Sequence, residues 1–316
     1  MSNLKLGILP WSQAVAWADL LDVARRVERL GYQHVWAWDH LYAIFGDPGQ
    51  PIFEGWQTLA AWAMATERVQ IGLMVGANTF RNPGLVAKTV TTLDHISGGR
   101  AILGLGGAWF ELEHTAHGIP FGRGFGERLD WLDESVAACR TLLDGGTVTS
   151  APGAHYAFRD LHQEPSPVQR HLPIMIGGTG RKKTLRTVAR YADQWNAQGT
   201  PAELAEFDDI LREHCLAVGR DEREIERTGN LWMVIRDTEA EAEAVWAAAM
   251  VHNKTPLQES LEPSRPLFGP PVAIAERIRE MVAVGFESVI IEMPAPFDVE
   301  TLERLIGEVK PLVDAA

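Results

Sequence analysis

Gly31-Tyr32-Gln33-His34-Val35 and Gly285-Phe286-Glu287-Ser288-Val289 are two similar stretches near opposite ends of the chain. Each glycine follows apolar residues at helical spacing and precedes a short apolar run. Glycine readily adopts the left-handed conformation that ends a helix. The two stretches therefore predict the same helix-to-strand unit. The spaced residues are Leu20, Val23, Val27 and Leu30 in the first unit, and Val272, Ala275, Ile278 and Val282 in the second.

The same alternation of strand and helix continues between these units. Strands are expected at 4–9, 34–38, 69–75, 101–105, 173–177, 193–196, 230–235 and 288–292. Further helical patterns cover 56–66, 83–96, 124–143, 182–191, 201–217 and 238–250. Short apolar strands that alternate with helices predict a parallel sheet covered on both faces. Eight such units favour a closed (β/α)₈ TIM barrel over an open sheet, so residues 1–316 are expected to form one domain.

Composition and net charge exclude several classes of partner for this protein. The chain has 316 residues, 46% of them hydrophobic, and a net charge of −13. No global basic field exists to attract nucleic acid or anionic lipid, so neither is an expected partner. The first twenty residues lack the pattern of a signal peptide or membrane span. Cys139 and Cys215 are the only cysteines, which excludes a disulfide framework and fits a cytoplasmic protein.

Two long irregular stretches interrupt the alternation, at about 144–170 and 252–270. Both are longer than an ordinary connection in an α/β protein. Insertions of this kind tend to shape a substrate pocket, and a disordered surface loop is the alternative. The residues that decide the substrate are expected in these insertions.

The functional residues of a barrel lie just after each strand. Here those positions are rich in glycine and aromatic residues, which offer close backbone approach and flat apolar walls to a planar cofactor. The segments are 38–40, 74–78, 104–109, 177–180 and 195–196.

One of these segments, 177–184, combines glycines with three cations at an expected helix start. Free N–H groups and the helix dipole favour a phosphate there, and a glycine-rich turn with a solvated charge run is the alternative. Gly180 is followed by Arg181, so the segment is not a Walker loop. Segment 104–109 has Trp109 in place of the third glycine of a dinucleotide fingerprint, which disfavours a nicotinamide site.

His40 directly follows Asp39 at the end of a predicted strand. An imidazole at this place is suited to proton transfer near neutral pH, although an isolated histidine is often structural. No metal site is expected from Glu111, Glu113, His114 and His117, because their spacing does not match a helical zinc motif.

Five segments of the chain resemble the bacterial luciferase-like flavin-dependent oxidoreductases, and together they cover most of its length. They are Thr79-Phe80-Arg81-Asn82-Pro83, Leu93-Asp94-His95-Ile96-Ser97-Gly98-Gly99-Arg100, Gly104-Leu105-Gly106-Gly107-Ala108-Trp109-Phe110-Glu111, Ile176-Gly177-Gly178-Thr179-Gly180 and Tyr191-Ala192-Asp193-Gln194-Trp195-Asn196. The resemblance is strongest to the branch that uses the deazaflavin coenzyme F420 rather than FMN.

This resemblance implies a set of residues around the cofactor. His40 would act as an acid or base beside the ring, with Asp39 orienting the cofactor or the imidazole. A non-prolyl cis peptide between Met74 and Val75 would support the ring. The remaining expected contacts are the backbones of Gly106 and Gly107, the phosphate ligands Gly177, Gly178 and Thr179, and the residues Gly180, Arg181, Trp109 and Trp195, with Lys182 as an alternative source of charge.

One position departs from the sugar-phosphate dehydrogenases of this branch. They carry a glutamate where this chain has Gly107, and Glu111 is the nearest acid. The expected activity is therefore F420-dependent hydride exchange with a small organic molecule, such as reduction of an activated C=C, imine or nitro group.

Three other activities stay open from the sequence. They are an FMN-dependent monooxygenase, a flavin-binding barrel without catalysis and a metal-dependent hydrolase, although the hydrolase lacks its expected strand-end His-x-His motif. The expected partner is a small-molecule substrate, and a homodimer is the assembly that the sequence leaves open.

Overall fold

The computed structural model describes residues 4–258, 260 and 266–315 and contains a closed barrel of eight parallel strands. Closure is direct, because the first barrel strand pairs with both the second and the last. The last strand also pairs with the seventh. The predicted fold is therefore confirmed. The barrel strands are β1 (Lys5–Pro10), β2 (His34–Ala37), β3 (Gln70–Leu73), β5 (Ala101–Gly106), β6 (Ile174–Gly177), β7 (Gln194–Ala197), β8 (Glu226–Ile235) and β10 (Ser288–Met293).

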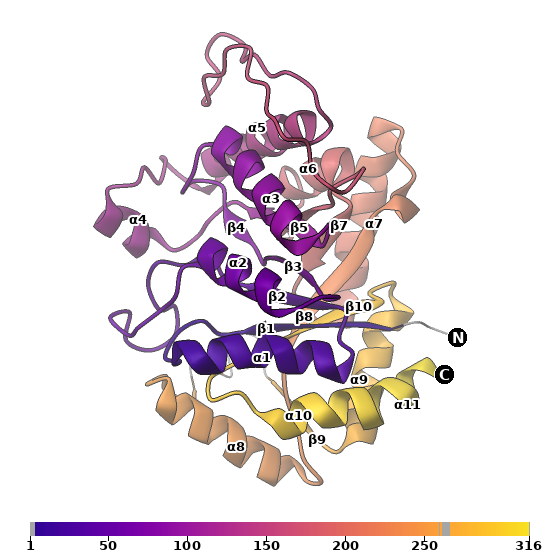
Figure 1. Ribbon diagram of the computed structural model, residues 1–316. Coiled ribbons are helices and arrows are strands. Elements are labelled where there is room, and N and C mark those ends of the chain that lie inside the picture. Colours follow the sequence, from indigo (N-terminus) through magenta and orange to yellow (C-terminus); the bar gives the residue numbers. More distant parts are fainter. Residues whose placement is uncertain (1–3, 259, 261–265, 316) are drawn as a thin grey trace.

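Helices surround the barrel, and the first and last described residues lie on the same side of it (Figure 1). The Leu4 N–H donates to Asp314 Oδ1 at 3.0 Å, which ties the first strand to the last helix. The helices are α1 (Trp17–Leu30), α2 (Gly55–Ala65), α3 (Pro83–Ser97), α4 (Glu111–His117), α5 (Phe125–Leu143), α6 (Thr184–Tyr191), α7 (Pro201–Val218), α8 (Glu239–His252), α9 (Pro271–Ala283), α10 (Val299–Arg304) and α11 (Lys310–Asp314).

Several elements differ from their predicted bounds. The strand expected at 69–75 ends at Leu73, and a further short strand, β4 (Gly76–Ala77), follows it. The peptide bond between Met74 and Val75 is cis, as predicted. Strand β8 begins at Glu226, four residues earlier than expected. Helix α4 was not predicted, because its seven residues are too few to show an apolar period.

The two expected insertions are both present as irregular stretches. In the first, Val148 and Leu161 form an isolated antiparallel bridge. The second contains β9 (Leu267–Gly269), which pairs with the end of β8. Residues 259 and 261–265 of this insertion lie outside the described residues.

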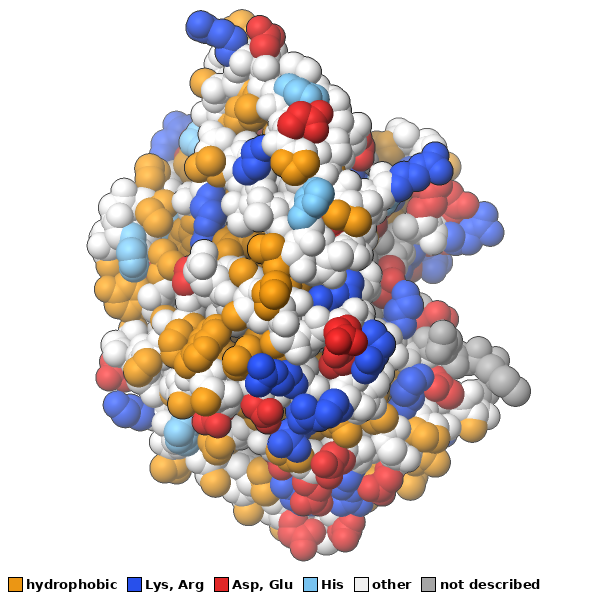
Figure 2. Space-filling model, in the orientation of Figure 1, with side chains coloured by type: hydrophobic (Ala, Val, Ile, Leu, Met, Phe, Trp, Pro, Cys, Tyr) orange, Lys and Arg blue, Asp and Glu red, His pale blue; other side chains and the backbone are white. Residues whose placement is uncertain are grey.

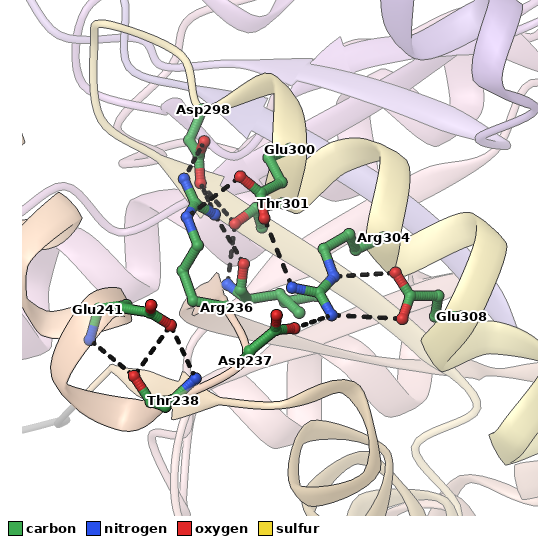
Figure 3. Close-up of polar contacts among 10 residues, drawn as sticks. Arg236, Asp237, Thr238, Glu241, Asp298, Glu300, Thr301, Arg304 and Glu308 are labelled. Atoms are coloured by element: carbon green, nitrogen blue, oxygen red, sulfur yellow. Dashed lines mark hydrogen bonds and ion pairs between the residues drawn. The ribbon is translucent and has the colours of Figure 1, made fainter.

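A polar network joins the end of β8 to α10 (Figure 3). Arg236 donates to both carboxylate oxygens of Asp298, at 3.0 and 2.8 Å. The Thr301 hydroxyl donates to Asp298 and accepts from the Ile235 N–H. Arg304 adds ion pairs to Asp237 and Glu308. These contacts fix the segment that follows β10 against the end of β8.

Charged side chains of both signs are mixed over the face shown in Figure 2. Lysines and arginines stand beside acidic residues there, and they do not form one broad basic area. This pattern agrees with the net charge of −13. Among the described helices, none is long and apolar enough to cross a membrane.

His34 is buried at the amino-terminal end of the barrel. A Cβ atom on Gly7 would lie 2.0 Å from His34 Nδ1, so the imidazole occupies space that only glycine leaves free. The Trp36 indole N–H donates to Nδ1 at 3.1 Å. Burial lowers the pKa of His34 to about 4. The imidazole is therefore neutral in the folded protein.

We expect acid to destabilise the protein through His34. Its pKa is lower in the folded state than the ordinary 6.5, so the unfolded chain takes up the proton first as the pH falls. Above pH 6.5 the ring is neutral in both states, and His34 does not lower the free energy of unfolding. Between pH 6.5 and 4 this free energy falls by about 3 kcal/mol, because only the unfolded chain binds the proton. Urea unfolding of the wild type and of His34→Gln across this range measures the effect. Equal losses in both proteins would remove His34 as the cause.

Candidate functional site

A cavity of about 520 Å³ opens at the carboxyl ends of the barrel strands. This is the end of the barrel at which functional residues were expected. It contains most of the predicted site residues and several that were not predicted. Its lining includes Trp38, Asp39, His40, Ile44, Phe45, Met74, Val75, Gly76, Ala77, Gly106, Gly107, Trp109, Glu113, Gly177, Gly178, Thr179, Asn196, Asn230, Trp232 and Glu292.

The buried carboxylate of Asp39 is held by Arg81 and by the backbone. Arg81 Nη1 donates to both oxygens, at 2.9 and 2.8 Å, and the Ala77 N–H donates to Oδ2 at 2.9 Å. Arg81 Nη2 donates to Glu54 at 2.7 Å. Burial raises the pKa of Asp39, and Arg81 opposes that shift. The carboxylate thus does not orient the imidazole, contrary to one of the two roles expected for it.

Glu113 is the partner of His40 instead. His40 Nδ1 lies 3.0 and 3.2 Å from the two carboxylate oxygens of Glu113, which also accept the Leu41 N–H at 2.8 Å. The Glu113 side chain is 2% exposed, while that of His40 is 15% exposed. A carboxylate only accepts hydrogen bonds, so a neutral imidazole donates from Nδ1 and keeps its lone pair on Nε2. That nitrogen is able to accept a proton.

Glycines and the cis peptide shape one wall of the cavity. A Cβ atom on Gly106 would lie 2.6 Å from Val75 Cγ2, and one on Gly177 would lie 2.9 Å from the same atom. Trp109 is 60% exposed and contacts the His40 ring at a centroid distance of 5.6 Å. Bare backbone beside flat rings fits a planar ring system, as the sequence predicted.

The loop after β6 offers unpaired backbone donors. The Gly178 N–H donates to Asn196 O, but the N–H groups of Thr179 and Gly180 have no acceptor among the described residues. Arg181 pairs with Glu206 and Lys183 pairs with Asp130, so Lys182 is the cation of this segment without such a partner among those residues. The loop fits an anion through its backbone more than through its side chains.

Three predicted cofactor contacts, Gly180, Arg181 and Trp195, do not line the cavity. The Trp195 side chain is fully buried, and its indole N–H donates to Gly178 O at 2.9 Å. Trp195 therefore supports the glycine loop from behind. The Arg181 guanidinium extends toward α7, where it lies 5.2 Å from the Phe207 ring centroid. Glu111, the acid expected near the site, is exposed on α4.

The insertions also differ from their expected role. No described residue of 144–170 or 252–270 lines the cavity. The first insertion approaches it only indirectly, through the Tyr156 hydroxyl, which donates to Asn78 O at 3.0 Å. The insertions were expected to shape the cavity, but the barrel strands and the segments that follow them form its walls.

Three residues on the side of the cavity formed by β8 and β10 were not predicted from the sequence. Asn230 and Trp232 belong to β8, and Glu292 belongs to β10. Asn230 Nδ2 donates to Glu292 Oε1 at 2.5 Å. Burial raises the pKa of Glu292. A signal was available, because a glutamate next to the end of an otherwise apolar barrel strand points to the carboxyl-end site.

The histidines of α4 have other partners than a metal. His114 Nε2 lies 2.7 Å from Thr79 Oγ1, and His114 Nδ1 lies 2.9 Å from Phe110 O. His117 Nδ1 lies 2.8 Å from Glu113 O. Across the described ranges, no group of three or more His, Cys, Asp or Glu side chains is arranged to hold a metal ion.

Comparison with known families and sequences gives consistent matches. A family model described as luciferase-like monooxygenase matches residues 6–267. An uncharacterized protein of Mycobacterium tuberculosis is 32% identical over 173 residues, which are 52% of this chain and 57% of that protein. That match thus spans little more than half of the relative's length.

Two further relatives differ in cofactor. An F420-dependent glucose-6-phosphate dehydrogenase of Kineococcus radiotolerans is 27% identical over 98% of this chain and 97% of its own. An FMNH₂-dependent dimethylsulfone monooxygenase of Pseudomonas putida is 27% identical over 71% of this chain and 60% of its own. Among solved structures, an F420-dependent secondary alcohol dehydrogenase has the same fold, with a TM-score of 0.84 and 20% identity over 99% of both chains.

We expect Arg81→Met to destabilise the protein more at pH 7 than at pH 5. Removal of one partner from a buried pair costs about 3 kcal/mol or more. Without Arg81 the pKa of Asp39 rises further, so the folded state keeps the proton to higher pH and loses stability as the pH rises through that pKa. Urea unfolding at pH 5, 6 and 7 measures the effect.

Two variants control this experiment. Glu54→Gln removes the other partner of Arg81 and should show little of this pH dependence. The double variant Arg81→Met with Asp39→Asn removes the buried acid and should abolish it. The explanation fails if the double variant retains the pH dependence of Arg81→Met.

Proposed function

The chain belongs to the luciferase-like monooxygenase family of flavin- or deazaflavin-dependent oxidoreductases, and we propose that it uses coenzyme F420. In this proposal a hydride passes between the deazaflavin and a small organic molecule. The observation that carries the proposal is the His40–Glu113 pair, which lies at the wall of the cavity beside Trp109.

Glu113 selects the tautomer of a neutral His40. Its carboxylate accepts from Nδ1, which orients the ring and leaves Nε2 to exchange a proton with the bound molecule. Because Glu113 also accepts the Leu41 N–H, its own position is fixed by the backbone. Removal of water around this pair would strengthen its interaction with a substrate.

The lining residues fit the cofactor. Trp109 and the backbones of Gly106 and Gly107 would lie against the ring, and the free N–H group of Thr179 would bind the phosphate. When bound, the deazaflavin supplies an acceptor or donor of a hydride. The protein contributes orientation, exclusion of water and a proton at His40.

The relatives support F420 over FMN. The F420-dependent dehydrogenase aligns with nearly the whole of both chains, whereas the match to the FMNH₂-dependent monooxygenase covers 60% of that enzyme. An FMN-dependent reaction is the main alternative, and a barrel that binds its cofactor without turnover is the second.

A cofactor titration tests this proposal. We expect F420 to quench the tryptophan fluorescence and to bind at least about tenfold more tightly than FMN, a difference of roughly 1.4 kcal/mol. Trp38, Trp109 and Trp232 line the cavity. Trp109→Phe should therefore lose part of the quenching, while Trp17→Phe on α1 should not. Tighter binding of FMN would contradict the proposal.

We expect His40→Ala to lower turnover far more than cofactor binding. A positioned acid or base contributes about 10²- to 10⁴-fold to rate and little to ground-state affinity. The measurement is the oxidation of reduced F420 with a panel of neutral acceptors, together with the Kd for F420. His95→Ala, which removes an imidazole from α3, is the matched control. A rate within about twofold of the wild type would exclude this role of His40.

A further inference from the structure

We propose that the side of the cavity formed by Asn230, Trp232 and Glu292 binds the polar group of an uncharged, largely apolar substrate and excludes phosphate esters. This inference rests on the proposed function, because it names the class of substrate that the same site accepts.

The cavity is lined by carboxyl groups and by no cationic side chain of Lys or Arg among the described residues. The carboxyl groups belong to Asp39, Glu113 and Glu292. A phosphate dianion that leaves water needs cationic or multiple N–H partners in exchange. On the side formed by Asn230, Trp232 and Glu292 a phosphate group would meet a carboxyl group in place of such partners, so the loss of its hydration would not be compensated.

Two arginines near the cavity are held by other groups. Arg81 lies behind Asp39 and pairs with Asp39 and Glu54. Arg128 donates to the carbonyl oxygens of Gly107 and Phe121 and stacks on the Phe121 ring at 3.7 Å. Neither side chain lines the cavity. Their charge is thus directed away from a substrate.

An unsatisfied polar atom identifies the binding surface. Asn230 Oδ1 is buried without a hydrogen-bond partner, and the buried Trp232 indole N–H interacts with the Glu292 carboxyl group. Glu292 accepts from Asn230 through one oxygen. Burial raises the pKa of Glu292, which favours its neutral form. A free acceptor beside a carboxyl group, whose neutral form can donate, suits a hydroxyl or carbonyl group.

The surrounding walls suit an apolar substrate body. Phe45 lies between Trp38 and Trp232, with ring centroids 6.0 and 5.6 Å away. Ile44 and Met74 add aliphatic surface. Aromatic and aliphatic walls gain stability from buried apolar area, so a ring or short chain would bind there with its polar group toward Glu292.

A matched series of ligands tests the inference. Cyclohexanol, cyclohexyl phosphate and cyclohexylamine share one ring and differ in charge. We expect cyclohexanol to bind the F420-loaded protein at least about tenfold more tightly than cyclohexyl phosphate, and no less tightly than cyclohexylamine. Isothermal titration calorimetry measures all three. Equal or tighter binding of the phosphate, tighter binding of the amine, or no binding of cyclohexanol would overturn the inference.

Variants of Glu292 test whether this residue binds the polar group of the ligand. Glu292→Leu removes the polar group and should weaken cyclohexanol binding by roughly tenfold, whereas Glu292→Gln keeps a donor and an acceptor and should stay within about threefold. Glu292→Lys should bind cyclohexyl phosphate more tightly than the wild type does. Glu111→Gln changes an exposed acid outside the lining and should leave all three affinities unchanged. If Glu292→Leu binds cyclohexanol as the wild type does, Glu292 has no part in recognition.

The two proposals fail in different ways. Binding of F420 is measured first, through the fluorescence of the cofactor itself, and its failure would remove the proposed function. The three ligands are then titrated into cofactor-free protein as well. If F420 binds but cyclohexyl phosphate matches cyclohexanol, only the inference about the substrate is wrong.

Discussion

Closure of the barrel is the constraint on which the site depends. Six consecutive residues of β1, from Lys5 to Pro10, pair with Ser288 to Met293 of β10. This parallel register joins the first strand to the last and places all carboxyl ends at one rim. His40, Glu113 and Glu292 are far apart in the sequence, and closure brings them to one cavity. The Arg236–Asp298 pair supports the closed barrel, because it fixes the chain after β10 against the end of β8.

Much of the fold could be predicted because periodicity and glycine placement are local. The junctions at Gly31 and Gly285 mark true helix ends, since both glycines have a φ of +93°. The cis bond between Met74 and Val75 could not be predicted from propensity, because a non-prolyl cis bond follows no pattern in the sequence. It was expected only through the family resemblance.

The site could be predicted in part. The sequence located His40, the glycines and Trp109 at the strand ends, and all of them line the cavity except Gly180. The direction in which a side chain points could not be predicted from the sequence. Trp195 also lies at the end of a barrel strand, yet its indole N–H donates to Gly178 O and the side chain does not line the cavity. Glu113 was grouped with possible metal ligands, because only the folded position of α4 shows that its carboxylate reaches His40.

Helix α4 gives the site a feature that the barrel does not share. Its seven residues are too few to be stable alone, so the helix depends on its contacts with the segments around it. His114 packs between the rings of Phe80 and Phe121, at 4.7 and 4.5 Å. Local opening of this small unit would part Glu113 from His40 without breaking any strand pairing. The acid–base pair can thus be taken apart at a free-energy cost below that of global unfolding, and amide hydrogen exchange in α4 reports how often this happens.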